Sequence, residues 1–332
     1  MATLYITEQQ ATLRKEHNRL VVERDGLALM EVHDFKVERV VVFGNAQIST
    51  QAMAFLLERG IDTAFLSTHG RLKGRLAPIE SKNSPLRIAQ YERSRDSAFA
   101  LDLARAMVAG KISNCAEVLA RHGRNHAGGN LQNEIAQIMA ASQKARRGRG
   151  LESLRGIEGT AAAIYFQGFA HCLRRNFNFH KRTRRPPADP VNSLLSFAYT
   201  LLYNEAISAC AATGFDCYIG FFHAIHYGRC SLALDLMEEF RPLVADRLAL
   251  NLVNLDIIKA DDFHKKEGQG FYLNDDARKR FLREYERMTT AEFAHKQTGE
   301  RTDMRRALHA QALVLQKTIL NGSDYKPFDG WR

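Results

Sequence analysis

The segment at residues 220–241, GFFHAIHYGRCSLALDLMEEFR, carries the side chains that are best suited to chemistry. It begins as an apolar run, passes through a loop at residues 227–229 and continues as a predicted helix with Ser231 as its N-cap. At about 100° per residue, one narrow arc of this helix contains four carboxylates, namely Asp235, Glu238, Glu239 and Asp246. Apolar residues fill the other faces, and buried like charges are costly without a positive charge among them. The pattern therefore predicts a cleft that holds a divalent metal ion.

Two further residues could complete such a metal site. Glu158 lies between Gly156 and Gly159 at a predicted helix start. A glutamate there commonly faces solvent and interacts with the helix dipole, but its small neighbours would let another segment approach closely. His223 lies in the apolar run, where a histidine is often a core residue, and its spacing to His226 is not that of a zinc protease. One histidine and two carboxylates together suit Mg²⁺ or Mn²⁺, and the imidazole favours Mn²⁺.

The positive charge of the chain is concentrated in one region. The formal net charge of the 332 residues is +10. Residues 1–90 are nearly neutral, with 12 basic and 10 acidic side chains, whereas residues 144–185 have 11 basic and 2 acidic ones. Localised positive charge indicates a polyanionic partner, although a solvated basic face is the alternative interpretation.

Other features disfavour several classes of protein. Apolar runs fall short of the ~20 residues that cross a bilayer, and the N-terminus lacks the pattern of a signal peptide. Five cysteines without a CxxC pair indicate reduced thiols in a cytoplasmic protein. Serine-triad, P-loop and dinucleotide-binding fingerprints are absent, and no Lys-Ser/Thr pair follows the glycine-rich residues 122–130.

The first 84 residues are predicted to form a small, β-sandwich-like sheet domain. Short alternating or β-branched segments predict strands at residues 3–7, 11–16, 19–23, 27–32, 37–43, 62–67 and 71–76. One inserted helix is expected at about residues 49–59. Pro85, at the end of a short polar linker, marks the domain boundary.

Residues 85–320 are predicted to form a larger, all-helical catalytic domain, which makes the fold class α+β. Helical periodicity runs from Leu86 to Arg121 with an interruption at Gly110. Further helices are expected at residues 131–144, 157–173, 190–213, 275–287 and 303–320, with a hairpin or turn at residues 266–273. Residues 321–332 are expected to form a less ordered tail.

Three motifs occur in the order GIEGTAAAIYF, DPVNSLLSFAYTLLYNE and GFFHAIHYGRCSLALDLMEEFRP. Together they resemble the CRISPR-associated adaptation integrases, the Cas one family, over the whole chain, and RRPPADPVNSLLSF is most similar to the C subtype of type I systems. The resemblance implies a catalytic metal site built from Glu158, His223 and Glu238. It also implies a second acid and three supporting residues, which are Asp235, Asn192, Tyr165 and Ser231.

The resemblance further implies the reaction and the partners. Members of the family form dimers, join a small partner protein, Cas two, and insert short double-stranded DNA into the CRISPR array. The 3′-hydroxyl of the incoming DNA attacks a phosphodiester at a Mg²⁺ or Mn²⁺ site. The candidate residues for binding DNA phosphates are Arg146, Arg147, Arg149, Arg174, Arg175, Lys181, Arg182, Arg184 and Arg185.

Two alternative functions would use the same residues. A structure-specific DNA nuclease of repair would combine the same metal ligands with water as the nucleophile. A non-catalytic DNA-binding scaffold would keep the metal only as a structural ion. The combination of motifs favours the integrase, but the chemistry of the ligands does not separate it from the nuclease.

Overall fold

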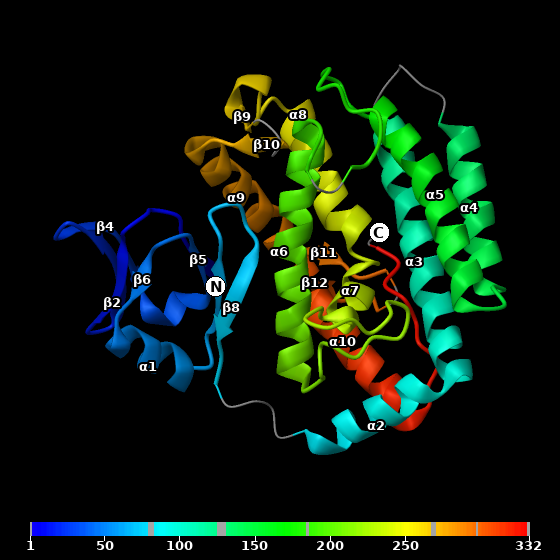
Figure 1. The fold of residues 1–332 in the computed structure, drawn as a ribbon, viewed down its shortest axis with the longest axis horizontal. Helices are drawn as coiled ribbons and strands as arrows, with labels where there is room; N and C mark the ends of the chain where they lie inside the picture. Colours follow the sequence, from blue (N-terminus) through cyan, green and yellow to red (C-terminus); the bar gives the residue numbers. More distant parts are fainter. Residues whose placement is uncertain are drawn as a thin grey trace. The chain divides into compact units, whose positions relative to one another are not determined.

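The computed structural model describes residues 2–78, 83–124, 131–183, 186–266, 270–296 and 298–330. Its contacts divide the chain into two compact units, Met1–Glu80 and Ser81–Arg332. Strands make up most of the first unit and helices most of the second (Figure 1). The predicted α+β class is thus confirmed. Within the described ranges, the helices are all too short or too polar to cross a membrane.

The first unit contains two four-stranded sheets. One sheet has the order β1 (Ala2–Ile6), β5 (Val37–Phe43), β7 (Asp62–Leu66) and β8 (Leu72–Leu76), with β8 antiparallel to its neighbour. The other has the order β4 (Leu27–His33), β3 (Arg19–Arg24), β2 (Thr12–Glu16) and β6 (Gln47–Ile48). A short 3₁₀ turn, η1 (Asp34–Lys36), and one helix, α1 (Thr50–Glu58), complete the unit.

Alternating apolar residues explain why these strands bury one face. Leu4, Leu13, Val40 and Val42 belong to one core, and Leu56 of α1 packs into the same cluster. Each predicted strand is present within one or two residues of its expected ends. Strand β6 was not predicted, because a two-residue strand has too few side chains to show alternation.

The second unit is mainly helical. Its helices are α2 (Ser84–Arg95), α3 (Ser97–Arg124), α4 (Gln132–Arg146), α5 (Leu151–His171), α6 (Pro190–Thr213), α7 (Ser231–Met237), α8 (Arg247–Asn254), α9 (Asp275–Thr290) and α10 (Met304–Asn321). Its smaller elements are η2 (Pro242–Asp246), η3 (Ala260–Asp262), β9 (Phe263–Lys266), β10 (Gly270–Leu273), β11 (Phe293–Ala294) and β12 (Arg301–Thr302).

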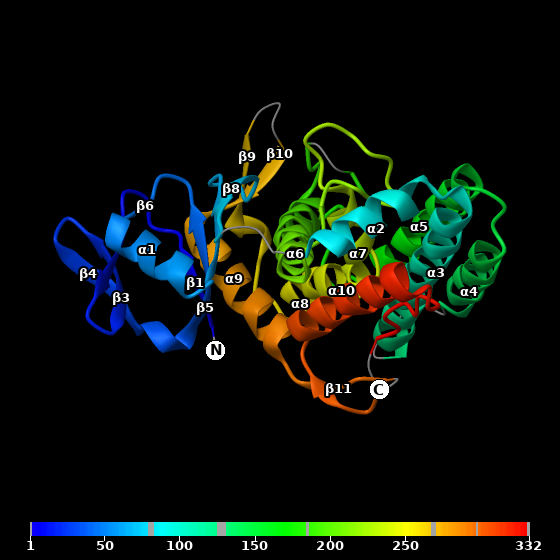
Figure 2. The ribbon, with the colours of Figure 1, turned by 90° about the horizontal axis from the view of Figure 1, so that it is seen from below.

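The long helices form the framework for the site. Helices α3, α4 and α5 lie side by side, and α10 crosses α2 and packs against it (Figures 1 and 2). Helix α6 packs against α7 and α10 and buries residues on all its sides, as expected for a helix that is apolar around its whole circumference. The Asp189 side chain caps its first turn, and Gly214, in the left-handed region, ends it, so the predicted bounds of residues 190–213 are confirmed.

The predicted interruption at Gly110 is wrong. Helix α3 runs through it without a break, and the chain is interrupted instead at Asp96, whose Oδ1 accepts hydrogen bonds from the backbone N–H groups of Ala98 and Phe99. A Cβ atom at Gly110 would lie 2.5 Å from the Cβ of Pro327. The glycine therefore allows the C-terminal tail to approach the helix closely.

The expectation of a less ordered tail is also wrong for its described part, residues 321–330. The ring of Phe328 is 1% exposed and stacks on Phe240 with 4.7 Å between the ring centroids. Tyr325 is also buried, and Gln311 of α10 donates a hydrogen bond to the carbonyl of Lys326. A sequence without helical or strand periodicity gave no sign of this packing.

Candidate active site

Glu158 lies in the middle of helix α5 and not at its start. The helix begins at Leu151, about two turns before the predicted start, so the glutamate is not a first-turn partner of the helix dipole. Gly156 and Gly159 are exposed, and a Cβ atom at either would have no neighbour within 4 Å among the described residues. The predicted close approach at these glycines is therefore not made within the described chain. The Glu158 side chain itself is 24% exposed.

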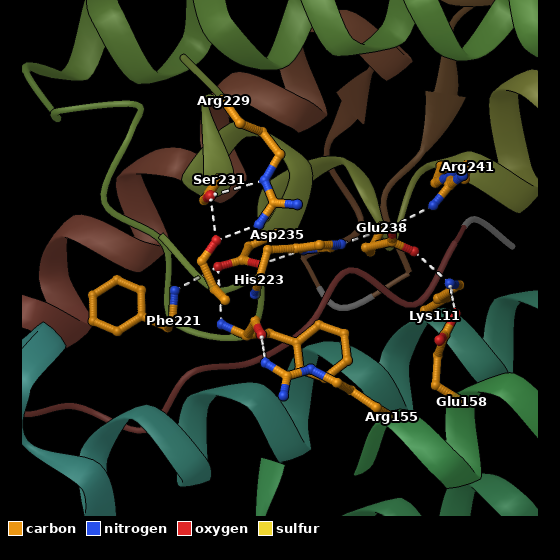
Figure 3. A network of polar contacts seen from close by, with 12 residues as sticks. Lys111, Arg155, Glu158, Phe221, His223, Arg229, Ser231, Asp235, Glu238 and Arg241 are labelled. Carbon is orange, nitrogen blue, oxygen red and sulfur yellow. Dashed lines mark hydrogen bonds and ion pairs between the residues drawn. The ribbon is translucent and has the colours of Figure 1, made fainter. Parts of the chain in front are cut away.

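Lys111 of helix α3 lies between two of the predicted metal ligands (Figure 3). Its Nζ donates to Oε1 of Glu158 and lies 2.5 Å from Oε2 of Glu238. Burial alone would lower the pKa of Lys111, but the nearby Glu238 and Glu158 outweigh it and raise the pKa. The side chain is thus a charged ammonium enclosed by two carboxylates.

His223 is held by a buried carboxylate. Oδ2 of Asp235 accepts hydrogen bonds from the N–H groups of Phe221 and Phe222, and its Oδ1 accepts one from the N–H of His223 and lies 2.7 Å from Nδ1 of the same ring. Since the Asp235 side chain is fully buried, it fixes the ring with Nδ1 as the donor. The other ring nitrogen, Nε2, then keeps its lone pair and lies 4.0 Å from Oε1 of Glu238.

The backbone that carries His223 lies directly on α7. A Cβ atom at Gly220 would lie 2.8 Å from both Ser231 and Asp235, so only glycine permits this approach. Ser231 is not the N-cap that the sequence predicted, since helix α7 begins one residue earlier than expected and its N-cap residue is Cys230. The Ser231 hydroxyl instead donates to the carbonyl of Ala224 and so ties the loop to the helix.

The surroundings of Glu238 strongly perturb its pKa. Its side chain is 5% exposed, and burial would raise its pKa, yet Arg241 and Lys111 hold the pKa well below its ordinary value. Arg241 donates to its Oε1 and lies over the ring of Tyr199, 4.3 Å from the ring centre. Glu238 is therefore a carboxylate that stays ionised in a buried setting.

The four acids of the predicted arc do not share one site. Glu239 accepts hydrogen bonds from the hydroxyl of Tyr325 and the N–H of Phe328, so it anchors the tail. Asp246 accepts from the hydroxyls of Tyr165 and Tyr199. The physical reason is that residues 231–254 are not one regular helix: α7 ends at Met237 and a π-helical turn, η2, begins at Pro242, so each acid meets different partners.

A small cavity adjoins the acids. It encloses about 60 Å³, and its lining includes Lys111, Glu158, Tyr165, Tyr199, Arg241 and Pro242. Asp246 also lines this cavity, so the acids at its wall are Glu158 and Asp246. Tyr165, predicted to support the site, lines this cavity and donates to Oδ2 of Asp246 at 2.9 Å.

Asn192 supports the site from a different side. Its side chain is completely buried at the start of α6, where Oδ1 accepts from Arg182 and from the N–H of Thr183, and Nδ2 donates to the carbonyl of Lys181. It therefore fixes the path of the basic segment before α6. Arg182, predicted to bind DNA, is half-buried and also lies over the ring of Tyr199.

The arrangement fits a divalent cation in its donor chemistry. Two carboxylates contact the Lys111 ammonium, and Nε2 of His223 lies 4.0 Å from Oε1 of Glu238. Oε2 of Glu238 is buried without a hydrogen bond of acceptable geometry among the described residues. In the described part of the chain, no three His, Cys, Asp or Glu side chains already converge as a metal-binding group. The ammonium of Lys111 lies between Glu158 and Glu238, so each of these two carboxylates contacts the ammonium. The assignment of the three ligands stays a prediction.

Comparisons with known proteins agree in one family. The family model for CRISPR associated protein Cas1 matches residues 4–287. CRISPR-associated endonuclease Cas1 3 from Thermus thermophilus is 38% identical over 331 residues, which cover 99% of this chain and 97% of the relative. The chain belongs to the Cas1 family. This is the Cas one family of the sequence resemblance; the matches do not establish the type I-C branch, which stays a prediction.

Solved structures support the same placement of this Cas1 family member. A CAS1 protein from Thermotoga maritima superposes with a TM-score of 0.80 at 28% identity, covering 96% of this chain and 97% of that chain. A Cas6-RT-Cas1–Cas2 complex contains a chain that superposes with a TM-score of 0.81 at 25% identity, covering 99% of this chain and 36% of that chain. The order of a β-rich unit before a helical unit is thus that of known Cas1 structures.

Sequence reasoning missed two cations of the Cas1 site, Lys111 and Arg241. A signal for the lysine is present in α3. Lys111 lies in a buried stripe of this helix, between Met107 and Asn114, and the same stripe also contains Leu103 and Val118. A charged residue within an apolar stripe requires a partner of opposite charge. Arg241 follows Glu238 by three residues, the spacing of an intrahelical ion pair.

The predicted DNA-binding residues fall into three groups. Arg182 makes the buried contacts given above, and Arg175 forms an exposed ion pair with Asp256. Arg184 and Arg185 lie outside the described residues. The remaining candidates are exposed, and these are Arg146, Arg147, Arg149, Arg174 and Lys181.

Proposed function

We propose that this Cas1 family member is a metal-dependent DNA integrase and endonuclease of CRISPR adaptation, which inserts short DNA into the CRISPR array by attack of a 3′-hydroxyl on a phosphodiester. One observation carries the proposal. The Lys111 ammonium joins Glu158 to Glu238, and Nε2 of His223 lies 4.0 Å from the other oxygen of Glu238, beside a cavity lined by Glu158 and by basic and tyrosine side chains. The name of the Thermus thermophilus relative, an endonuclease, supports the cleavage of phosphodiesters.

Glu158, Glu238 and His223 would hold Mg²⁺ or Mn²⁺. When bound, the ion would lower the pKa of the attacking hydroxyl and neutralise negative charge on the scissile phosphate. Asp235 is not needed as a ligand, because its oxygens already accept three backbone N–H groups and face the imidazole. Its role is to keep His223 in the tautomer that presents Nε2.

The remaining chemistry needs little more from the chain. The DNA supplies the nucleophile, so no serine or cysteine has to form a covalent intermediate. Arg241 keeps Glu238 ionised and oriented through their ion pair. Phosphodiester exchange is nearly isoenergetic, which agrees with the absence of a P-loop from the sequence.

The proposed partners are double-stranded DNA, a second copy of the chain and a small Cas2 protein. The exposed basic residues near α4, α5 and α6 would bind DNA phosphates. Residues 1–84 would contribute to the dimer, and this is supported by exposed apolar side chains at Leu27, Met30 and Phe35. The Cas2 partner is proposed because the solved Cas6-RT-Cas1–Cas2 complex, which contains the similar chain, also contains Cas2. Residues 85–320 would form the catalytic domain, in a protein that acts in the cytoplasm.

A joining assay separates the three candidate functions. The chain and a Cas2 partner are incubated with short duplex DNA and a supercoiled plasmid that carries a CRISPR repeat, with Mn²⁺ or with EDTA. We expect joined products that disappear with EDTA and with Glu158→Gln but persist with Glu92→Gln, an exposed glutamate of α2 that serves as the matched control. Cleavage without joining would favour the nuclease, and DNA binding without either product would favour the scaffold.

A further inference from the structure

Two cysteines that the proposed mechanism does not use lie side by side at the base of the loop that carries His223. All five cysteines lie in the described part of the chain, and none is in a disulfide. The thiol of Cys217 donates to the sulfur of Cys230, with 2.7 Å between the two Sγ atoms. The N–H of Leu232 donates to the carbonyl of Cys217 at 2.9 Å, so the backbones on both sides of the pair are fixed relative to each other.

The surroundings of Cys230 favour its thiolate. Its pKa is lowered to about 7, first by the hydrogen bond from Cys217 and then by those from the hydroxyls of Tyr203 and Tyr218, while burial opposes the shift. Cys172 provides the contrast within the same chain, since burial raises its pKa to about 12. A thiolate next to a second thiol is the arrangement of a redox-sensitive dithiol.

We propose that Cys217 and Cys230 are a redox-sensitive pair that hydrogen peroxide converts to a disulfide, which clamps the loop at residues 218–229. A disulfide joins sulfur atoms ~2.0 Å apart, so the two thiols have to approach by less than about 1 Å. The loop between the two cysteines contains His223, so oxidation of the pair would restrict the movement of that side chain. It does not depend on the metal or on the proposed reaction.

The oxidation proceeds in two balanced steps. The thiolate sulfur of Cys230 attacks one oxygen of the peroxide, the O–O bond breaks, and the released hydroxide takes up the proton that Cys230 had lost and leaves as water. The sulfur of Cys217 then attacks the sulfenic sulfur of Cys230 while its thiol proton leaves with the displaced hydroxide as a second water. Two thiols lose two electrons in total, and one peroxide is reduced to two waters.

The test uses the full-length chain, treated with a small excess of hydrogen peroxide in EDTA and then analysed by peptide mapping without reductant. We expect a linked pair of peptides that contains Cys217 and Cys230 and that separates again with dithiothreitol. Hydrogen–deuterium exchange at residues 218–229 should slow by about tenfold in the oxidised protein, because a clamped loop opens less often. The Cys172→Ser variant, as the matched control, should behave like the wild type.

Single variants identify the attacking sulfur. In Cys217→Ser, dimedone should trap a sulfenic acid at Cys230, whereas in Cys230→Ser it should trap none at Cys217. The inference is overturned if peroxide gives no linked peptides while other side chains become oxidised, or if the disulfide forms and exchange in the loop is unchanged. If a variant fails to fold, dimedone can be added to the wild type before the disulfide forms, where it should trap a sulfenic acid at Cys230 and none at Cys217.

Discussion

Replacing Lys111 with methionine should make the apo protein less stable and its metal binding tighter. Methionine keeps the length of the side chain and removes its charge. The wild-type ammonium is 12% exposed and touches Glu158 and Glu238, whose side chains are 24% and 5% exposed. Its loss leaves two carboxylates in a buried site without their shared cation.

The size of both effects follows from the same contact. Removing one partner of a buried ion pair costs about 3–5 kcal/mol, and the lower figure applies here because Glu238 keeps Arg241 and Glu158 retains some solvent. For a chain of this size about 3 kcal/mol corresponds to a fall in Tm of roughly 4–6 °C. In the wild type, a metal ion has to displace the ammonium, so the same free energy should appear as Mn²⁺ affinity that is about a hundredfold tighter in the variant.

Calorimetric titration with Mn²⁺ and thermal unfolding with and without Mn²⁺ measure both quantities without an activity assay. Mn²⁺ should raise the Tm of Lys111→Met more than that of the wild type. Lys144→Met, at an exposed lysine of α4, is the matched control and should change neither value. If Lys111→Met binds Mn²⁺ no more tightly than the wild type, the ammonium does not occupy the position of the metal and the reasoning is refuted.

Three further predictions follow from other contacts. Asp235→Asn should weaken Mn²⁺ binding by about 10–100-fold in the same titration, because it loses control of the ring of His223; unchanged affinity would contradict that role. Burial raises the pKa of Glu239 to about 8, above its value in the unfolded chain. The protonated side chain therefore adds to the free energy of unfolding; this contribution is complete below about pH 4.5 and is lost as the pH rises to 8. Urea unfolding should therefore show Glu239→Gln gaining stability relative to the wild type by up to roughly 1.4 kcal/mol per pH unit in this window, and a difference that does not vary with pH would oppose it. Replacing the exposed Arg146, Arg147 and Arg149 together by alanine should reduce the slope of log K for duplex DNA against log salt by about 2.7. An unchanged slope would show that these three arginines do not belong to the DNA interface.

The sequence by itself determined most of the secondary structure, because its signals are local. The alternation of apolar residues placed the strands of the first unit, and the predicted helix at residues 190–213 has the bounds of α6. Local patterns made Glu158, His223 and the acids of residues 235–246 candidates, and the choice of Glu158, His223 and Glu238 as ligands came from the resemblance to the Cas1 family. The local patterns needed only neighbours along the chain.

Only the tertiary structure decided how the buried charges are partnered. Glu238 and Glu239 are adjacent in sequence, yet one meets Lys111 and Arg241 and the other meets the tail at Tyr325, because Pro242 interrupts the helix and long-range packing supplies each partner. Periodicity describes the face on which a side chain lies, and it contains no information on which distant segment covers that face. The free energy of a buried charge depends on that distant segment, so the electrostatics of the site could be known only after the chain was folded.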